Sequence, residues 1–175
     1  MASLVAFGFW AFAGPTMYRT VGEGGLYAGC ALLFILVGSL LLRPLTSLSL
    51  SRFALLYAAA FAGYALCWCA AWFFVRGRAG EWMGSFAGSV AFCVIAAAFL
   101  AAWRSLPKMV VILFVGNAAG YFLGSYAYHL LRHEYSLLSK LAWGLFYGIG
   151  MGAALGYIFH IAETKSSREV GVDTA

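Results

Sequence analysis

Residues 143–160 read WGLFYGIGMGAALGYIFH, an apolar segment with no charged side chain and with glycine at positions 144, 148, 152 and 156. In water, glycine in a helix costs roughly 1 kcal/mol relative to alanine. In lipid, helices associate by close van der Waals contact, which small residues allow. A spacing of four places Gly144, Gly148, Gly152 and Gly156 on one stripe of a helix. The segment therefore predicts a membrane-spanning helix that packs along its glycines.

The composition of the whole chain indicates the same environment. Hydrophobic residues make up 64% of the 175 residues and charged residues only 10%, whereas a soluble domain has about 25% charged residues. The formal net charge of +5 is spread along the chain without a Lys/Arg-rich block, which is typical of basic loops near lipid headgroups and not of nucleic-acid binding. We expect an all-α integral membrane protein whose partner is the lipid bilayer.

Five apolar runs are long enough, or nearly so, for a span of about 20 residues: 24–42, 53–75, 84–103, 109–131 and 141–161. Residues 1–18 also lack charged side chains, although Pro15 is unfavourable near a helix end. This segment could instead re-enter the membrane, or be cleaved after Ala13. We expect it to span, which gives a compact bundle of six helices, with five as the alternative. The bundle forms a single domain over residues 1–162, followed by a polar tail over residues 163–175.

With six spans, both termini lie on one side of the membrane. That side carries slightly more basic residues (Arg43, Arg52, Arg104, Lys108, Lys165 and Arg168) than the other (Arg19, Arg76, Arg78, Arg132 and Lys140). The positive-inside rule then predicts a multi-pass protein of the plasma (inner) membrane with both termini in the cytoplasm.

A weak internal repeat accompanies these spans. FAGYALCW at 61–68 and AAGYFLGS at 118–125 share A-G-Y-x-L in register, 57 residues apart. This pattern predicts three helical hairpins of about 57 residues, and in transporters such repeats place binding sites at the repeat interface. The alternative is that apolar sequences rich in Ala, Gly and Leu align by composition alone.

Polar groups inside the spans are scarce. Asn117 is the one strongly polar side chain set well within a span, on a helix that has its own glycine stripe of Gly116, Gly120 and Gly124. Its amide either bonds to another helix or lines a solute or ion path. The path candidates are Asn117, Gly116, Gly120, Gly148 and Gly152.

Two groups of residues have metal-binding chemistry. His129 and His133 lie one turn apart if their helix continues past Leu131, and with Glu134 they would form a rim site. Cys30, Cys67, Cys69 and Cys93 fall at one expected depth, about 9 to 14 Å from the same side, and thiolates there would suit Cu(I) or Zn. The alternatives are a polar collar for the first group and apolar packing for the second.

These features predict a small permease-like or channel-like protein that binds or translocates a small solute or ion, alone or as a homo-oligomer. The alternative is a non-catalytic assembly subunit that packs against other membrane proteins, and the third hypothesis is a membrane enzyme with the rim His/Glu site. We find no nucleophile motif, and thus no catalytic residue, and no motif that assigns a family or a cofactor.

Overall fold

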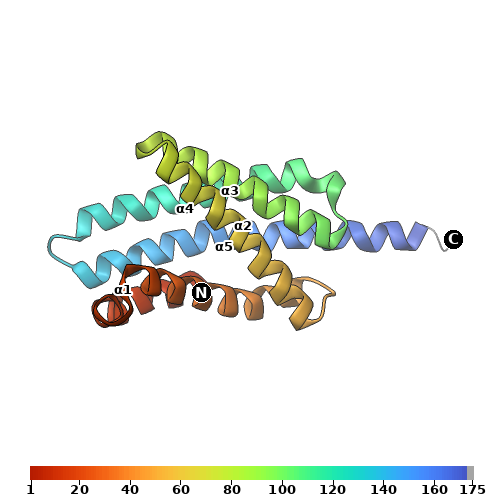
Figure 1. Cartoon of the computed structure of the whole chain (residues 1–175). Helices are drawn as coiled ribbons and strands as arrows, with labels where there is room; N and C mark the ends of the chain where they lie inside the picture. Colours follow the sequence, from red (N-terminus) through yellow and green to blue (C-terminus); the bar gives the residue numbers. More distant parts are fainter. Residues whose placement is uncertain (173–175) are drawn as a thin grey trace.

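The computed structural model describes the backbone of residues 1–172 and the side chains through Thr164. The described chain is helical, with five long helices joined by short connections (Figure 1). The helices are α1 (Ala2–Leu42), α2 (Leu50–Phe74), α3 (Gly77–Leu100), α4 (Leu106–Leu131) and α5 (Ser136–Val172). Each of them is long and apolar enough to cross a membrane. The expectation of an all-α fold is therefore confirmed, and the five long apolar helices indicate a multi-pass integral membrane protein.

The connections follow from local backbone chemistry. The side chain of Ser49 accepts a hydrogen bond from the Arg52 N–H and thereby caps the start of α2. Pro107 stands in the first turn of α4, where its missing N–H costs nothing. Between α2 and α3, Arg76 and Gly77 take φ values of 59° and 56°, so the chain reverses through left-handed backbone.

Helix α1 consists of two arms, residues 2–21 and 23–42, separated by Gly22. Gly22 has φ 74° and ψ −176°, a conformation that only glycine adopts readily. In a continuous helix, Ala6 and Cys30 would lie about 36 Å apart. Instead, the Cys30 thiol donates to the Ala6 carbonyl with an Sγ–O distance of 3.6 Å. The two arms therefore fold back against each other.

The prediction of six spans is wrong, because the structure has five helices and the first arm of α1 does not cross the bundle. Ser3 Oγ donates to the Gly144 carbonyl at 2.6 Å, and Met1 lines a cavity together with Met151. Met151 lies 12 residues before Glu163, or about 18 Å along α5. The first arm thus starts beside the middle of α5, which agrees with the re-entrant alternative and not with a full span.

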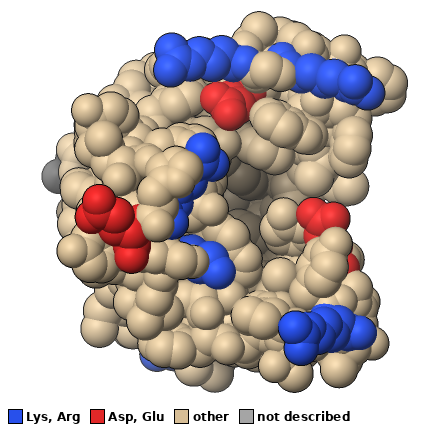
Figure 2. Space-filling view, turned by 90° about the vertical axis from the view of Figure 1, so that its left-hand side faces the viewer, with Lys and Arg blue, Asp and Glu red and all other residues tan. Residues whose placement is uncertain are grey.

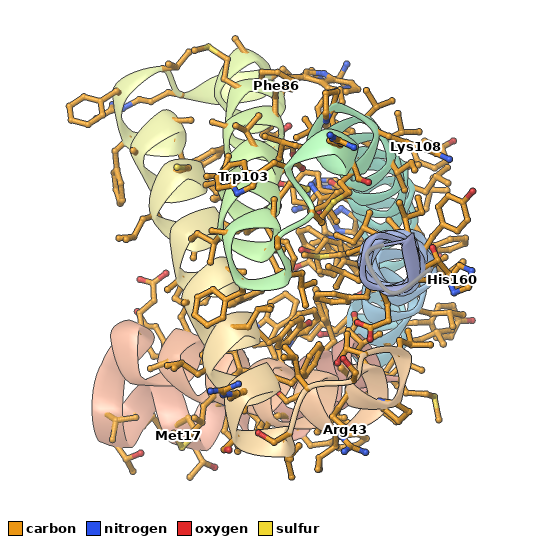
Figure 3. The ribbon with its side chains drawn as sticks, turned by 90° about the vertical axis from the view of Figure 1, so that its right-hand side faces the viewer. Met17, Arg43, Phe86, Trp103, Lys108 and His160 are labelled. Atoms are coloured by element: carbon orange, nitrogen blue, oxygen red, sulfur yellow. The ribbon has the colours of Figure 1, made fainter. Side chains whose placement is uncertain are left out.

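The helices form three consecutive antiparallel hairpins: the two arms of α1, then α2 with α3, then α4 with α5 (Figure 1). We call the end of the bundle that holds Gly22 and the α2–α3 and α4–α5 turns the tip end. The linker end is the opposite end, with residues 43–49 and 101–105. Seen from the linker end, α5 lies nearly end-on, with α3 and α4 to one side and α1 to the other (Figure 3). The hairpins agree with the predicted arrangement, while the 57-residue repeat itself stays a prediction.

Glycines hold α4 and α5 at close range. A Cβ on Gly116 would come within 2.7 Å of the Gly150 carbonyl oxygen, and one on Gly120 within 2.9 Å of the Phe146 carbonyl oxygen. Gly124 faces the Trp143 side chain. The partner of the α4 stripe is thus the surface around Gly150, which is not on the stripe that begins at Gly144.

The stripe of the opening segment faces α1 instead. A Cβ on Gly144 would meet Phe7, one on Gly148 would meet Ser3 at 3.1 Å, and one on Gly156 would reach Leu45 at 3.8 Å. At Gly152 nothing lies within 4 Å of that position. Helix packing therefore does not require glycine at position 152.

Helix α5 extends beyond the predicted domain boundary at residue 162 and remains helical through Val172. The backbone of most of the predicted polar tail therefore continues the last span as a helix. Residues 173–175 of that tail lie outside the described residues.

Candidate functional site

A hollow opens in the tip end of the bundle. Figure 2 looks onto this end and shows a recess between groups of basic and acidic side chains. The recess exists because α2 runs diagonally, so that α1 and α2 touch near the linker end and diverge toward the tip end (Figure 1). Near the linker end, a Cβ on Gly38 would meet the Tyr57 ring, and the Phe34 and Phe61 rings lie 5.0 Å apart.

Aromatic side chains line this tip-end hollow. It consists of two adjoining cavities of about 300 and 320 Å³, which share Phe7, Tyr27 and Trp143. All of the lining residues are aromatic except Ala6, Leu26 and Cys30, and none of them carries a charge. The complete lining set also includes Trp10, Tyr64, Trp68, Tyr121 and Tyr147. Such a wall suits a ligand with an apolar or cationic surface.

Polar side chains from three helices form the floor. Tyr64 of α2 donates its hydroxyl proton to Asn117 Oδ1 of α4 at 3.1 Å, and Tyr147 of α5 lines the same cavity as Tyr64. Tyr147 lies 11 residues into α5, about 16 Å from the start of that helix. The floor thus lies about halfway through a hydrocarbon core of about 30 Å.

Asn117 belongs to this floor but does not line the hollow. Its side chain is 0% exposed, and its Nδ2 has no hydrogen-bond partner among the described residues. Tyr64, which donates its hydroxyl proton to Asn117, lines the hollow in its place. One of the two roles predicted for Asn117 was a hydrogen bond to another helix. The structure contains such a bond, and its partner is Tyr64, which the sequence analysis did not identify.

Two carboxylates stand at the mouth of the hollow. Tyr121 donates to Glu81 Oε1 at 3.4 Å, and Glu23 lies one helical turn before Tyr27 on α1. Both tyrosines line the hollow, while the two carboxylates come from α3 and α1. The mouth therefore places negative charge next to an uncharged aromatic wall.

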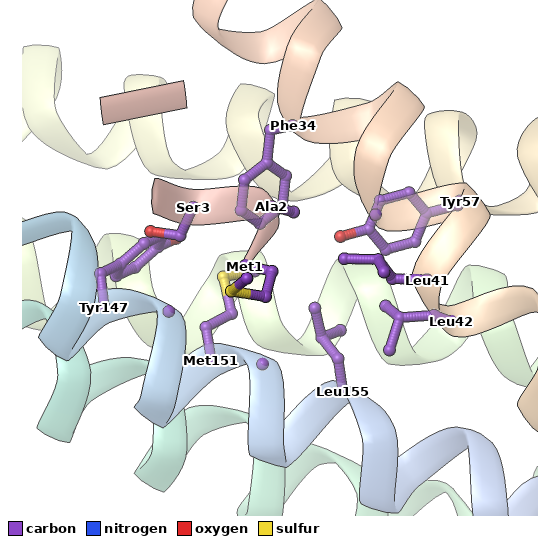
Figure 4. Close-up of a pocket in the computed structure, with 13 residues that line it drawn as sticks. Met1, Ala2, Ser3, Phe34, Leu41, Leu42, Tyr57, Tyr147, Met151 and Leu155 are labelled. Carbon is purple, nitrogen blue, oxygen red and sulfur yellow. The ribbon is translucent and has the colours of Figure 1, made fainter. Parts of the chain in front are cut away.

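A second cavity of about 230 Å³ lies between α1, α2 and α5, on the linker-end side of the first arm of α1 (Figure 4). Ser3, Tyr57, Gly148 and Gly152 are among its lining residues. Tyr147 lines both this second cavity and the tip-end hollow. Met1, together with Ala2 and Ser3 of the first arm, borders the second cavity.

The predicted rim metal site does not assemble. Helix α4 ends at Leu131, so His133 and Glu134 fall in the following turn and not on the helix that carries His129. Among residues whose side chains the structure describes, no group of three or more His, Cys, Asp or Glu is close enough to hold a metal ion.

The four cysteines do not share one depth. Cys93 lies 16 residues into α3, about 24 Å from the start of that helix, because α3 begins at Gly77 and not at the predicted residue 84. Cys93 is buried in the core, Cys69 is exposed, and Cys30 lines the tip-end hollow. The thiols are therefore distributed over separate environments.

The sequence pointed to glycines and Asn117 and missed the aromatic residues of the hollow. Trp68 and Trp143 lie about two turns from a tip-end helix terminus and Tyr121 about three, and interfacial anchoring already accounts for aromatic residues near span ends. Only the divergence of α1 from α2 turns them into the wall of a hollow. The sequence feature that could have indicated the hollow was the number of tyrosines and tryptophans on the tip-end halves of several spans.

The fold and this hollow define the class of protein. It is a multi-pass helical membrane protein with a recess that reaches the middle of the bundle. Comparison with known proteins gives no match among protein-family models, curated proteins or solved structures.

Proposed function

We propose that this protein binds a small solute in the tip-end hollow and passes it across the membrane, as a permease-like or channel-like protein. The observation that carries this proposal is that Tyr147 lines both the tip-end hollow and the second cavity. The two spaces therefore lie in series along the bundle, with one side chain and the first arm of α1 between them.

The four glycines predicted to line the solute path have two different roles in this proposal. Gly148 and Gly152 line the second cavity, where bare backbone widens the wall. Gly116 and Gly120 lie in the close contact between α4 and α5 and have a packing role. The solute route then runs along α5 on the side that faces α1, and not between α4 and α5.

We further propose that the protein lies in the plasma (inner) membrane with its linker end in the cytoplasm. The basic residues predicted for that end outnumber those of the tip end by six to five. With the linker end in the cytoplasm, the tip end, and so the mouth of the hollow, lies on the outside. The first arm of α1 then enters the bundle from the tip end and stops midway.

The test is solute flux into liposomes that contain the purified chain. Light scattering after mixing with a panel of small uncharged and charged solutes measures how fast each solute enters. Tyr147→Ala removes the side chain between the two cavities, so we expect entry at least about three times faster than with the unmodified chain. The matched control is Tyr157→Ala, also on α5 and 48% exposed, which should leave entry unchanged.

Equal rates for the unmodified chain, Tyr147→Ala and protein-free liposomes across the panel would contradict the proposal.

The assembly-subunit hypothesis stays a prediction, and purification in mild detergent with other membrane proteins in fixed proportion would favour it. The rim-enzyme hypothesis also stays a prediction and now lacks an assembled site.

A further inference from the structure

We propose that the solute of the tip-end hollow is a small organic cation, an ammonium or quaternary ammonium compound. This inference rests on the proposed function and names its substrate class. It depends on three observations: the aromatic wall, the distribution of charge at the mouth, and a cation of the protein itself that already lies on one of the rings.

The wall can hold a cation without a buried counter-charge. Aromatic rings attract ammonium groups through their π faces, and several rings around one space form the cages that recognise quaternary ammonium ligands. Here the rings come from α1, α2, α4 and α5. Tyr121 contacts Trp68 and Trp143, with centroids 6.2 and 5.8 Å apart. These contacts fix the orientation of the rings before a ligand arrives.

Arg19 and Lys140 line a neighbouring recess that shares Trp10 and Leu26 with the hollow, but the charges that contact the wall of the hollow itself favour a cation over an anion. No Lys or Arg is among the lining residues of its two cavities. Instead, the Glu81 carboxylate accepts a hydrogen bond from the lining Tyr121, and the Glu23 carboxylate lies one helical turn from the lining Tyr27. An anion would meet the negative faces of the rings and these carboxylates together. A cation is attracted by both.

One ring of the hollow already binds an ammonium group. Lys140 Nζ lies over the Trp10 ring, 5.0 Å from its centroid, at the edge of the hollow. The volume also fits a small ligand, because cavities of about 300 Å³ are at the lower end of the range for ligand pockets. A choline-sized cation matches this space.

The experiment compares choline with 3,3-dimethyl-1-butanol, its uncharged carbon isostere, by calorimetric titration of the full chain in lipid nanodiscs. The two probes have the same shape, so any difference reports the positive charge. We expect saturable choline binding and an isostere affinity at least about ten-fold weaker. Equal or tighter binding of the isostere, or no saturable choline binding up to about 10 mM, would overturn the proposal.

Variants locate the binding. Glu81→Gln removes one carboxylate and should weaken choline binding about three- to ten-fold without changing isostere binding, whereas Glu134→Gln, in the α4–α5 turn, should leave both unchanged. Tyr27 is 64% exposed, so it can be replaced without disturbing the core. Tyr27→Phe keeps the ring and should keep most of the affinity, while Tyr27→Leu should lose about three-fold or more.

The variants can also fail in an informative way. Equal choline affinity in Tyr27→Leu and Tyr27→Phe would overturn a ring-based site in the hollow. Such a result leaves the flux assay with Tyr147→Ala untouched. Failure of the substrate class and failure of the proposed function are therefore distinguished by separate measurements.

Discussion

The hydrogen bond from Tyr64 to Asn117 is the one described link between polar side chains of α2 and α4. Both residues are buried, and Asn117 Nδ2 already lacks a partner among the described residues. A polar group in a hydrocarbon environment costs free energy when its hydrogen bonds are not made. The pair therefore contributes to the position of α2 relative to α4, and it also fixes the orientation of the Tyr64 side chain, which lines the hollow.

Tyr64→Phe removes the donor and keeps the ring. We expect it to lower the free energy of unfolding by about 0.5–1.5 kcal/mol, because Asn117 Oδ1 loses its partner in a buried site. Unfolding by sodium dodecyl sulfate in mixed micelles, followed by circular dichroism, measures the change. The control is Tyr126→Phe on α4, where the side chain is 66% exposed. Equal effects of the two substitutions would show that the buried hydrogen bond contributes nothing.

At the scale of elements, the contact between α4 and α5 depends on bare backbone. A Cβ on Gly150 would overlap the carbonyl oxygen of Gly116 and come within 2.8 Å of Gly120 Cα. These atoms belong to the backbone of the facing helix and cannot rotate away. The two helices must therefore separate if residue 150 gains a side chain.

Gly150→Ala should destabilise the chain by about 1–3 kcal/mol, since overpacking forces the backbone to shift. Gly152→Ala lies two residues further along the same helix and adds the same methyl group. Because nothing lies within 4 Å of its Cβ position, it should be neutral, or stabilising by up to about 1 kcal/mol through helix propensity. The same unfolding assay compares them. A loss for Gly152→Ala as large as that for Gly150→Ala would contradict this account of the interface.

At the scale of the whole molecule, the first arm of α1 folds back at Gly22 and packs beside α5, where Ser3 donates to the Gly144 carbonyl. The structure then has five helices long and apolar enough to cross a membrane. The second cavity, on which the proposed route depends, lies where this arm meets α5 beside Gly148 and Gly152.

Five passes place the tip end and the linker end on opposite sides of the membrane. In a chain whose four cysteines are replaced by alanine, we expect Arg78→Cys at the tip end to react with an impermeant maleimide in intact host cells. Ser51→Cys at the linker end should react only after the cells are made permeable. Gel mobility of the labelled chain measures both. Reaction of both positions in intact cells would contradict the five-pass arrangement, and the reverse pattern would invert the orientation.

The sequence by itself determined the environment and the elements of this protein. A chain with 64% hydrophobic and 10% charged residues cannot cover a water-soluble surface, and in lipid each backbone polar group must be satisfied within a helix. The positions of four of the five helices followed from apolar length and from breakers such as Arg43-Pro44 and Pro107. Each of these inferences uses only neighbours along the chain.

Only the tertiary structure decided which surfaces meet. The depth of the first arm of α1 depends on its contacts with α5, such as that between Ser3 and Gly144. The hollow depends on the angle between α1 and α2, and this angle cannot be predicted from the sequence of either helix by itself. In lipid, glycine stripes and aromatic residues fit several partners almost equally well, because hydrophobic burial does not rank them. Close packing of all the helices at once selects one arrangement, and that arrangement brings Tyr64, Asn117 and Tyr147 together.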